Sequence, residues 1–189
     1  MHIRALAVVL VLTGGPFLAT AADEEHPYKK LKVGDYFTYK MMVKIGDKSM
    51  EGSLTKTVSA KSDKKIVLRQ TGKLDGMDLP SEEQEVDLSK PFDVTGGAVP
   101  SGTKDAKVEL VTDKHGKEKV KAAGKDYDCE WITLRVKGKQ DGLDMTADVK
   151  MWLSKECSLW VVKQEIQMEA AGMKFEIQID LAESGSKSD

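Results

Sequence analysis

The chain has 189 residues, with 29 Lys and Arg against 31 Asp and Glu and a formal net charge of −2. This length suits one domain, and the balanced charge offers no positive field for phosphates, which argues against a nucleic-acid-binding protein. The longest apolar run is shorter than the roughly 20 residues that a membrane-spanning helix needs, so we expect no span in the mature chain.

The first 21 residues have the pattern of an export signal. Arg4 provides the positive start, an apolar stretch follows, and Ala19-Thr20-Ala21 matches the small-residue cleavage site. We expect cleavage after Ala21 and a periplasmic or secreted product, the alternative being an uncleaved N-terminal anchor. Because no Cys follows the apolar stretch, we expect no lipid anchor.

Residues 22–182 alternate apolar and polar side chains, which predicts a single antiparallel β domain. A first strand carries its apolar side chains up to Ile45, and Gly46-Asp47 turns it into a second strand with Val43 opposite Met50. Further strands are expected at residues 64–73, 83–88, 107–112 and 118–122, with a tight turn at His115-Gly116. We expect a loop at residues 89–104 to act as a lid, and a disordered tail at residues 183–189.

Two segments repeat each other, residues 66–78 and residues 132–144. Eight of the thirteen positions are identical at a constant offset, among them Arg69 with Arg135. We interpret this as a duplicated hairpin that turns at Asp75-Gly76 and again at Asp141-Gly142. The alternative is convergence of two hairpins on the same favoured turn residues.

The C-terminal third predicts its own strand register. Counting outward from Asp141-Gly142, the strongest short hairpin signal, gives two chemically matched faces. The expected pairs are Ile132–Met151, Leu134–Val149 and Val136–Ala147 on one face, and Trp131–Trp152 and Arg135–Asp148 on the other. A second hairpin turning at Ala171-Gly172 gives Met168–Phe175, Ile166–Ile177, Val162–Leu181 and Lys163–Asp180. Joining the hairpins through residues 154–157 aligns Val149 with Val162 and Met151 with Trp160.

Cys129 and Cys157 form an even pair in an exported chain, and we predict a structural disulfide between them. In the predicted register they lie near 10 Å apart, beyond the roughly 7 Å that a disulfide allows between Cα atoms, so the loop carrying Cys157 has to curl back. The alternatives are two free thiols and a catalytic thiol.

The predicted fold is all-β, a meander of about ten strands that forms a curved half-barrel or open barrel with one continuous apolar face. That face either lines a cavity or fills a core. We predict that it binds a hydrophobic ligand through the following residues: Met41, Val43, Met145, Val149, Met151, Val162, Ile166 and Phe175.

Trp152-Leu153-Ser154, followed by Val161 to Glu165 and a turn at Gly172, resembles the C-terminal hairpins of exported bacterial half-barrel proteins related to the periplasmic lipoprotein carriers. The resemblance covers about the last 60 residues and implies a half-barrel fold. The chain departs from that pattern at residues 157–160, where Cys-Ser-Leu-Trp replaces the expected Pro and Gly, and it lacks the helices that plug the carriers. No functional residue carries over.

The sequence therefore predicts an exported, non-enzymatic β-protein that binds a lipid or acyl chain. The alternative is a structural or protein-interaction module of the cell envelope, with Trp131 and Trp152 as its partner-facing residues. His26 and His115 are poorly placed for catalysis, and no His, Cys, Asp and Glu set has the usual spacing of metal ligands, so no metal or other cofactor is expected.

Overall fold

The computed structural model describes residues 26–93, 104–140, 143–170 and 172–187. A single turn of 3₁₀ helix, η1 (Pro27–Lys30), precedes nine strands. The strands are β1 (Asp35–Ile45), β2 (Lys48–Lys61), β3 (Lys65–Leu74), β4 (Met77–Asp87), β5 (Lys104–Ala122), β6 (Lys125–Gln140), β7 (Leu143–Leu153), β8 (Val161–Ala170) and β9 (Met173–Ser186). The predicted export signal lies outside the described residues.

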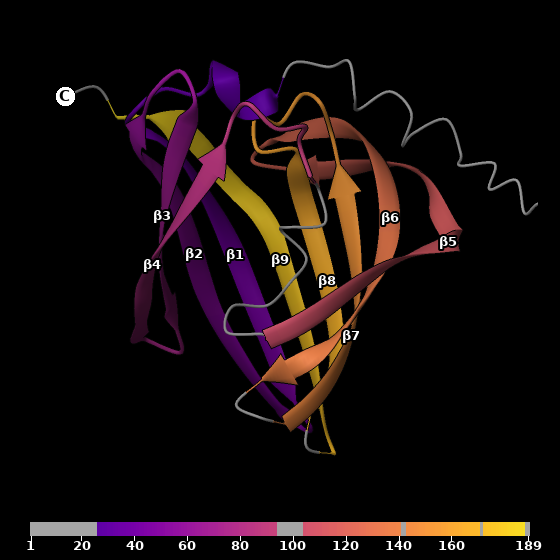
Figure 1. Cartoon of the computed structure of the whole chain (residues 1–189). Coiled ribbons are helices and arrows are strands. Elements are labelled where there is room, and N and C mark those ends of the chain that lie inside the picture. The colour runs from indigo at the N-terminus through magenta and orange to yellow at the C-terminus, as the bar shows by residue number, and fades with distance from the viewer. Residues whose placement is uncertain (1–25, 94–103, 141–142, 171, 188–189) are drawn as a thin grey trace, which may run out of the picture.

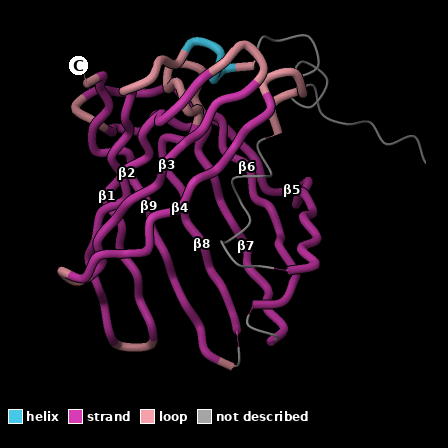
Figure 2. The backbone as a smooth tube through the Cα atoms, turned by 60° about the vertical axis from the view of Figure 1, so that its left-hand side comes forward, coloured by secondary structure: helices cyan, strands magenta, loops and turns pink. Residues whose placement is uncertain are grey.

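All nine strands belong to one sheet with the order β4-β3-β2-β1-β9-β8-β7-β6-β5. Each neighbouring pair is antiparallel, so the chain builds two meanders that join where the first strand, β1, pairs with the last, β9. The sheet curls into a half-barrel, and the edge strands β4 and β5 do not pair with each other (Figures 1 and 2). The predicted all-β fold, an open curved antiparallel meander, is confirmed.

The predicted register of the two C-terminal hairpins is also confirmed. In β6–β7, Ile132 lies opposite Met151 and Trp131 opposite Trp152, as counted from the Asp141-Gly142 turn, whose own residues lie outside the described ones. In β8–β9, Ile166 lies opposite Ile177. Matched apolar, aromatic and charged partners across each ladder are therefore enough to fix these registers.

The predicted alignment of the two hairpins with each other is wrong. Val149 pairs with Ile166 instead of Val162, and Met151 pairs with Gln164 instead of Trp160, a shift of four residues. The connection from Ser154 to Trp160 is longer than the expected loop, with Trp160 at a φ of 64° and the backbone N–H of Ser154 bonded to the Trp160 carbonyl. A register irregularity between Trp152 and Leu153 adds to the difference.

The duplicated hairpins occupy equivalent ladders, β3–β4 and β6–β7. Asp75 and Gly76, with φ of 51° and 80°, form the two-residue turn that the repeat predicts, since positive φ at both positions defines a type I′ turn. Ion pairs recur at matching positions, Arg69 with Glu83 at 2.8 Å and Arg135 with Asp148 at 2.7 Å. The first copy carries one extra residue, and a register irregularity in β3–β4 between residues 70 and 72 accommodates it.

Two local expectations fail. The predicted turn at His115-Gly116 lies inside β5, where Gly116 pairs with Trp131. A Cβ at Gly116 would lie 2.9 Å from the Trp131 ring, so this glycine serves close packing instead of a turn. Residues 183–186 of the predicted disordered tail continue β9, and Glu183 accepts a 2.6 Å hydrogen bond from the Tyr36 hydroxyl.

Buried side chains form two clusters. One fills the concave side of β6, β7 and β8 and consists of Leu134, Val136, Met145, Ala147, Val149, Met151, Leu153 and Ile166. The other lies around the end of the half-barrel that η1 covers and includes Leu31, Phe37, Tyr39, Val58, Leu68, Tyr127, Cys129, Cys157, Leu159 and Leu181. Much of the apolar face is thus consumed as core, and the remaining space lies where the clusters meet.

Candidate functional site

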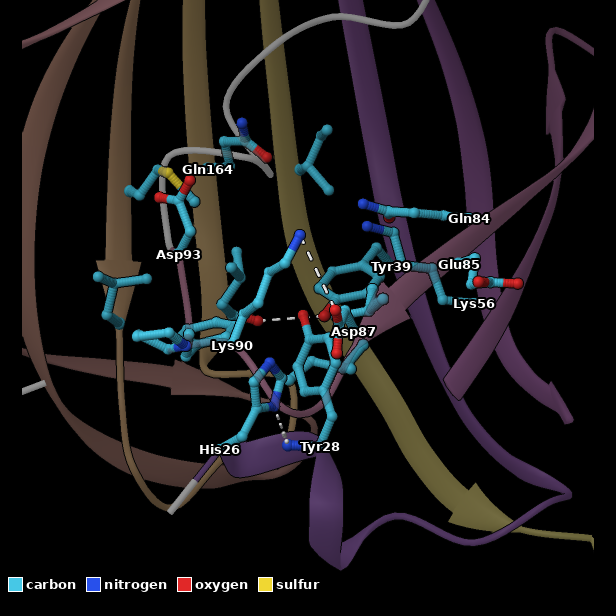
Figure 3. A pocket seen from close by; sticks show the side chains of 18 of the residues that line it. His26, Tyr28, Tyr39, Lys56, Gln84, Glu85, Asp87, Lys90, Asp93 and Gln164 are labelled. Atoms are coloured by element: carbon cyan, nitrogen blue, oxygen red, sulfur yellow. Dashed lines mark hydrogen bonds and ion pairs between the residues drawn. The ribbon is translucent and has the colours of Figure 1, made fainter. Parts of the chain in front are cut away.

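A cavity of about 370 Å³ opens on the concave side of the sheet (Figure 3). Its apolar wall comes from five strands and the β7–β8 connection, through Tyr39, Leu54, Met151, Leu153, Leu159, Val161 and Ile179. The volume lies at the small end of the range of about 300–1,000 Å³ that is typical of ligand pockets. The concave face is therefore partly a core and partly a cavity.

An aromatic cluster closes one end of the cavity. The Phe92 ring packs edge-on against His26 at 5.3 Å, Tyr28 at 5.3 Å and Trp160 at 5.0 Å between centroids. Such edge-to-face contacts stabilise by about 0.5–1.5 kcal/mol each beyond their buried area. Residues 90–93, the start of the predicted lid, line the cavity, and residues 94–103 lie outside the described ones.

His26 has a structural role at this end. Its Nδ1 accepts a 3.2 Å hydrogen bond from the Tyr28 backbone N–H, which caps η1. Burial and the nearby Lys29 lower the pKa of His26, against an opposing effect of Asp87, and the neutral imidazole is the form that can accept this bond. The arrangement favours a cap over a proton-transfer group.

Tyr39 anchors the floor of the cavity. Its hydroxyl donates a 3.1 Å hydrogen bond to the Val161 carbonyl, and its ring is 4% exposed. Burial raises the pKa of Tyr39 well above its ordinary value, so the phenol stays protonated and keeps donating. This contact ties β1 to the start of β8 across the intervening β9.

Lys56 extends into the cavity from β2 (Figure 3). Alternation along β2 places it on the same face as Leu54 and Val58, and it lies opposite Phe37 on β1. Burial lowers the pKa of Lys56. Its ammonium forms no hydrogen bond or ion pair with any residue in the described part of the chain. Sequence reasoning missed this residue, although a Lys between Leu54 and Val58 interrupts an apolar face.

Gln164 enters the same cavity from β8 and is only 9% exposed. Its side-chain amide has no hydrogen-bond partner among the residues that the structure describes, and every fully enclosed polar atom there is satisfied. The amide therefore faces the open space of the cavity. The sequence signal was again available, because Gln164 falls between Val162 and Ile166 on the inward-facing side of the strand.

Of the eight predicted ligand-binding residues, only Met151 lines this cavity. Val149 and Val162 are fully buried in the core, and Val43, Met145 and Ile166 are at most 8% exposed. Met41 and Phe175 are half-buried and lie outside the cavity wall. Packing between strands therefore buries most of the predicted face, and its role in ligand binding stays a prediction.

The predicted disulfide is absent from the structure, in which Cys129 and Cys157 are buried free thiols of one core cluster. The Cys157 Sγ instead lies 3.7 Å from the Val161 carbonyl oxygen. Burial raises the pKa of Cys129 to about 11 and also raises that of Cys157. Raised values of this kind are typical of inert core cysteines.

Trp131 and Trp152, the predicted partner-facing pair, are partly covered by their own chain. The Lys150 ammonium lies 4.1 Å and 4.2 Å from the two ring centroids. Trp152 is 3% exposed and donates from Nε1 to Glu118 at 2.9 Å. Trp131 is half-buried, so it is the member of the pair with surface left for another molecule.

No helix in the described residues combines the length and apolar character needed to cross a bilayer. Within the same residues, no three His, Cys, Asp or Glu side chains gather as a metal site would require.

No family model and no curated protein matches the sequence. Among solved structures, the chain is similar to a Bacteroides fragilis protein described as having a YmcC-like fold and inferred to be exported. The two are 11% identical, with a TM-score of 0.52, over 82% of this chain and 97% of the other. The likeness shows a shared fold, and the more specific resemblance to lipoprotein carriers stays a prediction.

Proposed function

We propose that this protein is an exported, non-enzymatic binding protein that holds a hydrophobic ligand, a lipid or acyl chain, in the cavity on its concave face. The observation that carries the proposal is the apolar cavity, walled by Leu54, Met151, Leu159 and other apolar side chains. The signal-like first 21 residues support export, as does the exported character inferred for the Bacteroides fragilis protein of similar fold.

The chemistry around the cavity favours binding over catalysis. His26, the imidazole nearest to it, is used as a helix cap, and both thiols have raised pKa values that disfavour the nucleophilic thiolate. The envelope-module alternative has weaker support, because Trp152 of its proposed contact pair is buried and hydrogen-bonded to Glu118.

Fluorescence of N-phenyl-1-naphthylamine, an uncharged probe that brightens in apolar sites, tests the proposal. Wild-type protein freed of lipid by extraction should bind it, and Leu54→Trp, which fills the cavity from β2, should weaken binding by about tenfold, or 1.4 kcal/mol. Met77→Trp is the matched control, because Met77 is 66% exposed at the β3–β4 turn. This variant should bind the probe as the wild type does.

Native mass spectrometry of the protein from an exported preparation provides the second readout. An additional mass of lipid size supports the proposal and identifies the ligand. A bare polypeptide together with no fluorescence increase in the wild type would overturn it.

A further inference from the structure

We propose that the ligand is a single-chain amphiphile with an anionic oxygen head group, carboxylate or phosphate, and that Lys56 binds this head group. The inference rests on the proposed function and specifies the class of ligand. It is carried by the placement of one unpaired cation in an apolar cavity.

Lys56 carries a positive charge in the wall of the cavity. Three acidic side chains share the cavity wall with it, and each has another partner: Glu85 pairs with Lys65 at 2.9 Å, Asp87 accepts from the Ser89 hydroxyl and backbone, and Asp93 is also engaged elsewhere. Lys56 has no such partner in the described residues. A partly buried ammonium without a counter-ion is unfavourable, so an anion that enters the cavity gains a charge-assisted contact there.

Gln164 carries the second polar group of the cavity without a partner among the described residues. This side chain is nine-tenths buried and faces the cavity from β8, which is separated from β2 by β1 and β9. A core position would favour an apolar residue, and an amide without a partner is unfavourable in the empty protein. Two unsatisfied polar groups in one apolar cavity indicate a ligand with polar atoms of its own, one of them negative.

The volume of the cavity bears on the size of the ligand. A volume of about 370 Å³ corresponds to about twelve water molecules at about 30 Å³ each. That space suits one medium-length alkyl chain better than the two chains of a diacyl lipid. The apolar residues between Lys56 and Gln164, Tyr39 and Ile179 among them, line the route that such a chain would take.

Displacement of N-phenyl-1-naphthylamine by dodecanoate, dodecyl phosphate and 1-dodecanol tests the inference, because the three share one chain and differ in head group. The wild type should prefer the anions to the alcohol by about tenfold, the 1.4 kcal/mol equivalent of a charge-assisted hydrogen bond at the low end. Lys56→Met should bring all three affinities within about twofold, because only the charge-dependent term is lost. The two anionic arms show whether carboxylate or phosphate is preferred.

Lys40→Met is the matched control, since Lys40 is exposed on β1 and alternates away from Tyr39. It should keep the wild-type preference. Equal wild-type affinity for the anions and the alcohol, with the probe still bound, would overturn the inference while leaving the proposed function intact. Absence of probe binding in the wild type would overturn both. The wild-type preference is measured without any variant, so the inference can be overturned even if the Lys56→Met protein fails to fold.

Discussion

Replacing Gln164 by Leu should stabilise the ligand-free protein. Gln164 is 9% exposed, and its amide lacks a partner in the described structure. A buried polar group without a hydrogen bond costs about 1–3 kcal/mol. Because the cavity has room for water, the amide keeps part of its hydration, and we expect the lower end, about 1 kcal/mol. For a domain of about this size, 1 kcal/mol corresponds to a rise of about 2–4 °C in Tm.

Urea unfolding of lipid-free protein at neutral pH measures this change as a shift in midpoint at constant slope. Gln167→Leu is the matched control, because Gln167 is exposed on the same strand and faces the other way, so its effect should stay within about 0.5 kcal/mol. A Gln164→Leu protein that is destabilised by about 1 kcal/mol or more would refute the reasoning, because it would mean that the amide makes a bond that the leucine loses.

Three further outcomes test other parts of the structure. Arg135→Met should cost about 0.5–1 kcal/mol at neutral pH, since its partner Asp148 is 34% exposed and solvent screens the pair. The Arg135 hydrogen bonds lower the pKa of Asp148, so this stabilisation is complete above the ordinary carboxyl pKa of 3.8 and fades as pH falls through the lower pKa of the folded protein. The urea midpoints of variant and wild type should converge at that low pH. A difference in midpoint that persists would contradict a stabilising role for the Arg135–Asp148 pair. Cys129 and Cys157 should resist iodoacetamide at pH 8 in the folded protein and both react in urea, whereas a mass lower by two hydrogens and no labelling in urea would show a disulfide. Ala123→Gly should raise stability by about 0.5–1 kcal/mol, because Ala123 has a φ of 48° in the β5–β6 turn, and an unchanged or lower unfolding midpoint would show that the alanine is not strained.

The strand pairing was predictable where a two-residue turn fixed the register of two strands with matched side chains. Asp75-Gly76 and the β6–β7 pairing of Trp131 with Trp152 follow from local chemistry alone. The alignment of β7 with β8 could not be predicted in this way, because the connection ends at Trp160 with a positive φ, a conformation that is uncommon for residues other than glycine. The other errors have different causes, because Gly116 permits close packing against Trp131 inside β5 and residues 183–186 pair with β1 as part of β9.

The candidate site was predictable only in part. Of the predicted ligand-binding residues, only Met151 lines the cavity, because periodicity cannot say which apolar residues a neighbouring strand will cover. The better signal was the exception to the pattern: Lys56 and Gln164 occupy inward positions that their flanking residues mark as apolar. Function is expected at polar residues that occupy inward, apolar positions at a cost in stability.

The pairing of β1 with β9 also determines when the protein can finish folding. Asp35 and Ser186, near opposite ends of the described chain, face each other in the ladder that joins the two meanders. Each meander consists of contacts between consecutive strands, but the ladder that unites them requires closing a loop of nearly the whole chain, which is slow. Because β9 is the last strand of the described chain to be synthesised, the ladder that joins the two meanders forms only after all the other described strands have been made. A polypeptide that folds late remains unfolded for longer, and transport across a membrane in an unfolded form requires this property.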